Sequence, residues 1–125
     1  MGRIFDTLVV GKRRFYTLFD TGAKHSFVSR EAARAGKRTE VRGRILVAIG
    51  GRRHRIAQVC VIEGTLRKKP VFLQAFVLPE IGDDADGRAI DVIFGVRAMQ
   101  DFGIRLDPAE ECVDMGSYRS TFVEF

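Results

Sequence analysis

Short stretches of alternating hydrophobic and polar residues recur along most of the chain, and this pattern predicts β-strands. Residues 4–10 and 13–19 are two such stretches, and the Gly-Lys pair between them predicts the turn of a hairpin. Residues 41–57 alternate again on both sides of Gly50 and Gly51. That segment predicts a second, long hairpin with a flexible glycine tip.

The rest of the pattern predicts only two short helices among further strands. One helix is expected from Ser29 to Gly36, and the other at residues 96–102 with Gly103 as its end. A charged turn is expected at residues 64–69 and an acidic loop at 80–88. Further short strands are predicted at residues 59–62, 71–78, 90–94, 104–107, 112–115 and 121–125.

Many short strands with one or two short helices are typical of an all-β protein, a small closed β-barrel or sandwich. The length of 125 residues suits a single domain over residues 1–125. No charge-free run approaches the roughly 20 apolar residues of a membrane helix, and the first residues show no apolar core of a secretory signal. We therefore expect a cytoplasmic protein, or a soluble domain of a larger one.

Neither the cysteines nor the acidic loop predicts a bound metal. Cys60 and Cys112 lack the spacing and the histidine partners of a zinc site, so we expect two reduced thiols. Asp83, Asp84 and Asp86 lack the spacing and the final glutamate of a calcium-binding EF-hand. A phosphate-binding glycine motif is absent as well. The sequence thus predicts no metal and no cofactor.

Charge is distributed unevenly along the chain. Residues 1–60 hold 14 Lys and Arg against 4 Asp and Glu, whereas residues 61–125 hold 7 against 12. A basic half is compatible with nucleic acid, with an acidic ligand or with a merely soluble surface. The basic residues are scattered through the expected strands and no aromatic residues are interleaved with them, so the charge alone does not favour nucleic acid.

The segment from Asp20 to Ala23 is the most informative for chemistry. Asp20 directly follows an apolar strand, and Thr21 and Gly22 come next. The threonine hydroxyl is suited to fixing a loop by hydrogen bonding, and the glycine lets backbone approach a ligand closely. An Asp-Thr-Gly sequence also occurs in ordinary turns, so by itself it is compatible with a simple turn and with a reactive carboxylate.

The order of motifs resembles the retropepsin-like aspartic proteases, the family that includes the retroviral proteases. The resemblance spans roughly residues 4–115. It implies an all-β fold of the retropepsin-like acid protease type, with Asp20 as the catalytic residue. It also implies that the threonine braces two loops across a dimer axis, that the glycine contacts peptide backbone, and that the long hairpin is a flap. The matching parts are Asp20-Thr21-Gly22-Ala23, Ile49-Gly50-Gly51 and Ile93-Phe94-Gly95, of which Thr21, Gly22, Ala23, Ile49, Gly50 and Gly51 are the expected substrate-binding residues.

Aspartic protease chemistry requires two carboxylates that share a proton, one acting as base toward water and the other as acid toward the substrate carbonyl. The chain has one copy of the motif, so a two-fold axis would bring Asp20 against Asp20 of a second chain. The resulting prediction is a homodimeric endopeptidase acting on a polypeptide. The alternative is a non-catalytic dimerisation or peptide-binding module on the same fold.

The sequence departs from the family's pattern in three places. Lys24 and His25 stand where viral members usually carry acidic residues, and we interpret His25 as a surface or subsite residue. Val96 and Arg97 stand where the helix often begins with a polar pair in the family, and the candidate ion-pair partners of Arg97 are Asp91 and Asp101. Third, the flap tip is followed by a basic run, which favours either acidic substrates or a solvated surface. That run is Arg52, Arg53, His54 and Arg55.

The predicted last strand, residues 121–125, alternates Thr121, Val123 and Phe125. Chain termini in this family often pair across the dimer interface, so the resemblance makes this strand a candidate dimer contact. Completion of the chain's own sheet is the alternative, because an unpaired apolar edge is a liability.

Overall fold

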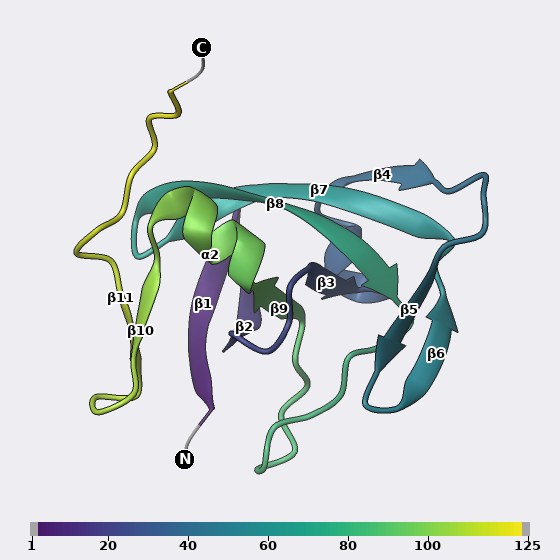
Figure 1. Ribbon diagram of the computed structural model, residues 1–125, viewed down its shortest axis with the longest axis horizontal. Coiled ribbons are helices and arrows are strands. Elements are labelled where there is room, and N and C mark those ends of the chain that lie inside the picture. The colour runs from purple at the N-terminus through teal and green to yellow at the C-terminus, as the bar shows by residue number, and fades with distance from the viewer. Residues whose placement is uncertain (1–2, 124–125) are drawn as a thin grey trace.

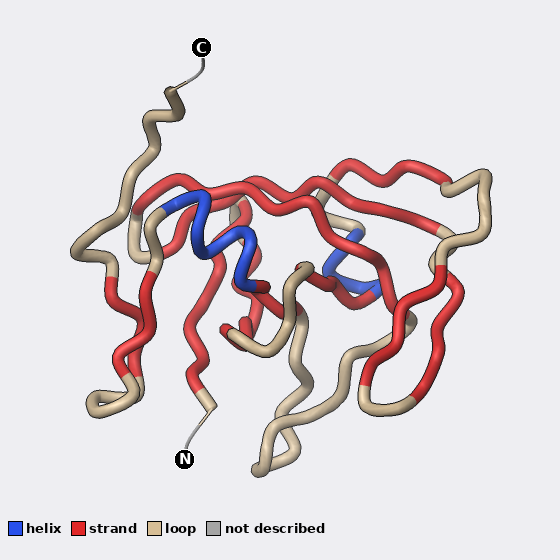
Figure 2. The backbone as a smooth tube through the Cα atoms, viewed as in Figure 1, coloured by secondary structure: helices blue, strands red, loops and turns tan. Residues whose placement is uncertain are grey.

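A closed barrel of six strands forms the body of the protein, as the computed structural model shows for residues 3–123 (Figures 1 and 2). The strands follow the order β1-β2-β9-β3-β8-β7, and pairing of β1 with β7 closes the barrel. β4 pairs with the free part of the β7 edge. The bounds are Ile4–Val10 for β1, Arg13–Asp20 for β2, Ser26–Ser29 for β3, Lys37–Glu40 for β4, Gln58–Leu66 for β7, Lys69–Leu78 for β8 and Val92–Gly95 for β9. This architecture confirms the all-β prediction, and 2 short helices accompany it.

Two separate hairpins and two helices complete the structure. β5 (Leu46–Ile49) and β6 (Arg52–Arg55) form a hairpin that projects from one end of the barrel (Figure 1). Its tip is tight because Gly50 and Gly51 have φ values of 56° and 78°, which side chains other than glycine rarely adopt. β10 (Arg105–Asp107) pairs with β11 (Cys112–Asp114). α1 spans Arg30–Ala33 and α2 spans Val96–Phe102.

Hydrophobic side chains form two clusters on opposite sides of the barrel wall. The larger cluster includes Phe15, Phe19 and Phe94, and it extends beneath α2. The smaller one, here named the outer cluster, packs the β5–β6 hairpin against the barrel through Val47 and Ile49. The barrel is thus tied to the hairpin by apolar burial rather than by strand pairing. The buried members of the outer cluster are Leu18, Phe27, Ile56, Leu78, Ile90 and Ile93.

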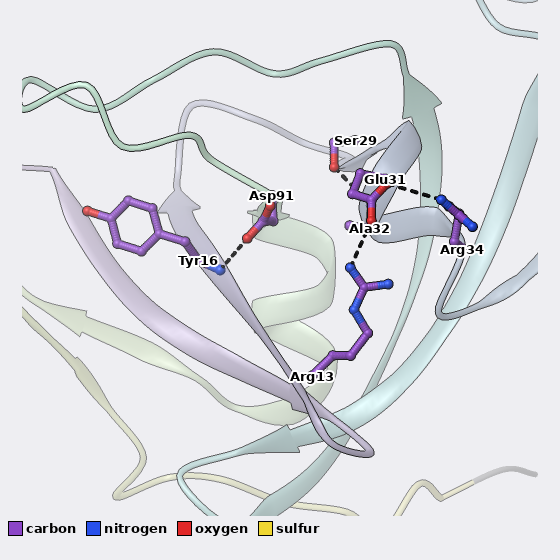
Figure 3. A network of polar contacts seen from close by, with 7 residues as sticks. All are labelled: Arg13, Tyr16, Ser29, Glu31, Ala32, Arg34 and Asp91. Atoms are coloured by element: carbon purple, nitrogen blue, oxygen red, sulfur yellow. Dashed lines mark hydrogen bonds and ion pairs between the residues drawn. The ribbon is translucent and has the colours of Figure 1, made fainter.

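Both predicted helices are present. α2 has the predicted bounds and ends at Gly103, whose φ of 66° gives the left-handed C-cap. α1 is shorter than predicted. It begins after Ser29, whose Oγ accepts a hydrogen bond of 3.1 Å from the backbone N–H of Ala32 (Figure 3). Among residues 3–123, no helix is long and apolar enough to cross a membrane.

The charged turn predicted at residues 64–69 is present, but it is shorter than predicted. β7 continues to Leu66 and β8 begins at Lys69, so the turn consists of Arg67 and Lys68 alone. Both turn residues have positive φ values, 49° and 70°, without the glycine or asparagine that usually marks such a turn. Gly64 is a residue of β7, paired with Val71 of β8. A Cβ at this position would lie 2.4 Å from the carbonyl oxygen of Val9 in β1, so only glycine fits.

Two other differences concern strands whose sequence carries no alternation signal or a misleading one. β4 was not predicted, because all four of its residues are exposed and it forms only by pairing with β7. The predicted last strand is absent over residues 121–123, and therefore this part does not complete the chain's own sheet. Phe122 packs instead against Phe102 and Phe72 outside the barrel. Phe125 lies outside the described residues.

Replacing Gly64 by alanine tests the contact that closes the barrel. The added Cβ would collide with β1 backbone, which cannot move aside as a flexible side chain can. We expect Gly64→Ala to lower the free energy of unfolding by about 2 kcal/mol or more, measured by urea denaturation. The matched control is Gly43→Ala, because a Cβ at Gly43 meets nothing within 4 Å. Equal stability of the two variants would contradict this account.

Candidate active site

Asp20 lies at the carboxyl end of β2, next to the parallel strand β9. Gly95, the last residue of β9, is its partner in the strand register. The backbone N–H of Gly22 donates a 2.8 Å hydrogen bond to Asp20 Oδ1, and the N–H of Ala23 donates to the Asp20 carbonyl at 3.1 Å. The turn that follows β2 therefore orients the carboxylate of Asp20.

The Asp20 loop, defined here as residues 20–25, is hydrogen-bonded to the beginning of α2. The backbone N–H of Val96 donates to the carbonyl of Ala23 at 2.7 Å, and that of Arg97 donates to the carbonyl of Lys24 at 3.2 Å. Only glycine fits at position 95, because a Cβ there would lie 2.4 Å from the carbonyl oxygen of His25. The glycine of the Ile93-Phe94-Gly95 motif thus determines how closely the loop approaches the helix.

Ser26 completes this attachment, although the sequence analysis did not single it out. Its buried Oγ accepts a 2.9 Å hydrogen bond from the backbone N–H of Gly95. A lone serine in an apolar strand carries no recognisable sequence signal, since its role depends on a residue 69 positions away. Phe94 adds a stacking contact with Phe19, at 4.8 Å between ring centroids.

A cleft of about 580 Å³ opens between this loop and the β5–β6 hairpin. It brings together Asp20, Gly22 and Ala23 on one side and Ile49 and Gly50 on the other, which are five of the seven residues expected in the site. Gly51 is not among its lining residues. The remaining lining residues are Lys24, His25, Phe27, Ile45, Leu46, Val47, Ala48, Phe76 and Ile93.

Thr21 points to a different part of the surface. It lines a second hollow of about 730 Å³, between the start of β1, α2 and β10. Asp20 lines both this hollow and the cleft. The carboxylate therefore lies where two depressions meet, one beneath the hairpin and one facing away from it.

Arg97 does not form either of the ion pairs suggested for it. Arg97 is exposed, and within the described part of the chain its guanidinium has no salt bridge with Asp91 or Asp101. Asp91 instead accepts a 2.8 Å hydrogen bond from the backbone N–H of Tyr16 (Figure 3). This bond connects β2 to the residue that precedes β9.

The acidic loop is ordered by Asp84. This carboxylate accepts hydrogen bonds from the Tyr16 hydroxyl at 2.7 Å and from the backbone N–H groups of Asp86 and Arg88 at 2.9 Å. The hydroxyl is the main reason that the pKa of Asp84 lies below its ordinary value. The same bond raises the pKa of Tyr16. Residues 3–123 contain no group of three or more His, Cys, Asp or Glu arranged to hold a metal ion.

Tyr16 is held on both faces of its ring. One face stacks on Phe5, with ring centroids 4.5 Å apart, and the guanidinium of Arg88 lies 3.8 Å from the ring centroid. The tyrosine thus fixes the acidic loop, which leads directly into β9.

Comparison with solved structures identifies the fold. The protein matches 239 chains. One is the crystal structure of the retroviral protease-like domain of Ddi1 from Leishmania major, with 19% sequence identity over 93% of this chain and 90% of that chain, and a TM-score of 0.64. The chain therefore has a retropepsin-like fold. No protein-family model matches its sequence, and no curated protein does.

Removing the Ser26 hydroxyl tests the attachment of the Asp20 loop. Ser26→Ala leaves the buried N–H of Gly95 without its acceptor, and we expect the free energy of unfolding to fall by about 1–3 kcal/mol. Denaturant titration measures this change. The exposed Ser117 gives the matched control, for which Ser117→Ala should stay within about 0.5 kcal/mol of the parent protein.

The Tyr16 hydroxyl gives a prediction about pH. Tyr16→Phe removes the main cause of the lowered pKa of Asp84, so that pKa should rise toward its ordinary value of 3.8. The pKa of Asp84 is lower in the folded state than in the unfolded chain, where it has its ordinary value of 3.8. The ionised carboxylate therefore stabilises the fold at pH values above 3.8, and this stabilisation is lost as the pH falls through the folded-state pKa. An NMR titration of the Asp84 carboxyl carbon measures the shift, and an unchanged pKa in the variant would contradict the assignment.

Proposed function

We propose that the protein is an aspartic endopeptidase that hydrolyses polypeptides with Asp20. The observation that carries this proposal is the position of Asp20 within a retropepsin-like fold. Its carboxylate lies in a cleft, is oriented by the N–H of Gly22, and faces a hairpin with a glycine tip. This arrangement suits an extended polypeptide bound between the Asp20 loop and the hairpin.

The active enzyme in this proposal is a homodimer. Each chain supplies one Asp20 carboxyl group. The chemistry requires two such groups, one ionised and one protonated. Asp20 also lines the second hollow, so it is accessible from the side away from the hairpin as well. A second copy approaching from that side would bring the two Asp20 loops together, and Thr21 would then lie between them.

The proposed reaction needs no covalent intermediate. The ionised Asp20 takes a proton from a water molecule as the water oxygen attacks the substrate carbonyl carbon, and the protonated Asp20 of the second chain donates its proton to the carbonyl oxygen. The tetrahedral intermediate then collapses. The protonated Asp20 donates to the leaving nitrogen as the C–N bond breaks, and the ionised Asp20 takes a proton from a hydroxyl of the intermediate, so that the pair again holds one proton.

The β5–β6 hairpin acts as the flap in this proposal. It is joined to the barrel mainly through the outer cluster, in which Val47 and Ile49 are only partly buried. Its glycine tip has no neighbour within 4 Å of the position of a Cβ on Gly50 or Gly51. A hairpin attached in this way can close over a bound polypeptide and exclude water from the cleft.

The test is cleavage of a peptide library between pH 4 and 7.5 by the parent protein and by Asp20→Ala. We expect a bell-shaped pH dependence, because one carboxylate of the pair must be ionised and the other protonated. Asp20→Ala should lose cleavage by about 1,000-fold or more, without loss of the dimer in sedimentation. Asp86→Ala is the matched control, since that carboxylate is exposed and outside the cleft.

A mixed dimer separates the shared site from two independent sites. Co-expression with two affinity tags yields a dimer with one parent chain and one Asp20→Ala chain, and this dimer should be inactive. Half of the parent activity would show that each chain works alone and would contradict the shared pair. A folded dimer that binds peptides without cleaving them would favour the peptide-binding module instead.

A further inference from the structure

Positive charge enters the cleft from the Asp20 loop. Lys24 and His25 both line the cleft and are exposed, and Asp20 is the only acidic residue in its lining. The ring of His25 packs edge-on against Phe76, with centroids 5.5 Å apart, which places it against the cleft wall. Lys24 has no ion pair among the described residues. Its ammonium group is thus available to a ligand.

The β5–β6 hairpin contributes a second positive charge on the side that faces the barrel. Its register pairs Ile49 with Arg52 and Val47 with His54, and side chains of paired residues lie on the same face of a hairpin. Ile49 and Val47 pack toward the outer cluster, so this face is directed to the barrel. Arg52 therefore lies on the hairpin face that is directed to the barrel, two residues after the cleft-lining Gly50, although it is not itself among the lining residues.

The opposite face of the hairpin carries the other arginines. Arg53 pairs with Ala48 and Arg55 pairs with Leu46, and all four are exposed. Residues 37–55 contain seven Lys and Arg but only one acidic residue, and none of the seven has an ion pair in the described structure. Three of these cations, Arg52, Arg53 and Arg55, lie in the hairpin beside the cleft, and such a charge raises the local concentration of anionic ligands.

We propose that the cleft selects polypeptides carrying Asp or Glu side chains beside the bound segment, held between Lys24 on the loop and Arg52 on the hairpin. This inference rests on the proposed function, because it names the substrate class of the same site. An extended peptide directs alternate side chains to opposite sides. Acidic side chains can then face the two cations while apolar ones face Phe27 and Ile93 at the base of the cleft.

A polypeptide suits this surface better than a nucleic acid. Single strands are bound by aromatic side chains interleaved with basic ones, because the bases stack on them. Residues 37–55 contain no Phe, Tyr or Trp. The two phenylalanines that line the cleft, Phe27 and Phe76, belong to the outer cluster and not to this basic segment.

The test measures binding without cleavage, so its outcome does not depend on the protease reaction. Two fluorescein-labelled pools of degenerate decapeptides are titrated with the Asp20→Ala protein and followed by anisotropy. The pools are identical except that four positions hold Asp or Glu in one and Asn or Gln in the other. We expect the acidic pool to bind about fivefold more tightly or better, with the difference reduced about threefold by Lys24→Gln or by Arg52→Gln.

Arg53→Gln is the matched control, because it removes the same charge from the opposite face of the same hairpin. It should change the affinity less than twofold. Equal binding of the two pools, or an equal loss in Arg53→Gln and Arg52→Gln, would overturn the inference. Stronger displacement of the probe by a thymidine 20-mer than by unlabelled acidic pool would also overturn it, in favour of nucleic acid.

The same variants distinguish this inference from the proposed function. In the parent protein, library cleavage sites should be enriched in Asp and Glu near the scissile bond, and Lys24→Gln should reduce that enrichment. Cleavage without such enrichment would leave the endopeptidase intact and overturn the substrate class. Preferential binding of the acidic pool without any cleavage would support the ligand class and overturn the endopeptidase.

Discussion

The close backbone approach between the Asp20 loop and the start of α2 is the constraint on which the candidate site depends. Two strands from distant parts of the chain run in parallel, and each ends at the same level. The loop after the first is bonded to the helix after the second through Ala23 and Lys24, and Gly95 allows the distance because it has no side chain. The carboxylate is thus positioned by the rigid barrel rather than by a free loop, which is what precise acid-base chemistry requires.

The surroundings of that contact divide into a firm part and a compliant part. Tyr16 joins β2 to the acidic loop and to the residue before β9, through two hydrogen bonds and contacts on both ring faces. The β5–β6 hairpin, by contrast, is joined to the barrel through partly buried apolar side chains. In the proposed function, the first part forms the fixed floor of the cleft and the hairpin its movable cover, because a polypeptide substrate must enter and then be enclosed.

Charge adds a second level of organisation to the same site. The basic half of the sequence is not spread evenly over the fold, because β4, the connection after it and the β5–β6 hairpin gather seven of its cations. The acidic half supplies the loop that Asp84 orders through hydrogen bonds rather than through ion pairing with these cations. No ion pair joins the two charged regions among the described residues.

The sequence alone determined the β class, the hairpin tips and the full extent of α2, because alternation and glycine positions are local signals. It also singled out Asp20 and the strand that ends at Gly95. It did not predict β4, the role of Ser26 or the continuous β7, since each depends on a partner strand far along the chain. Only the tertiary structure decided that Asp20 lines both hollows whereas Thr21 lines one of them, and that Arg52 and Arg53 lie on opposite faces. Side-chain direction at a loop or a register position follows from packing, which no local pattern encodes.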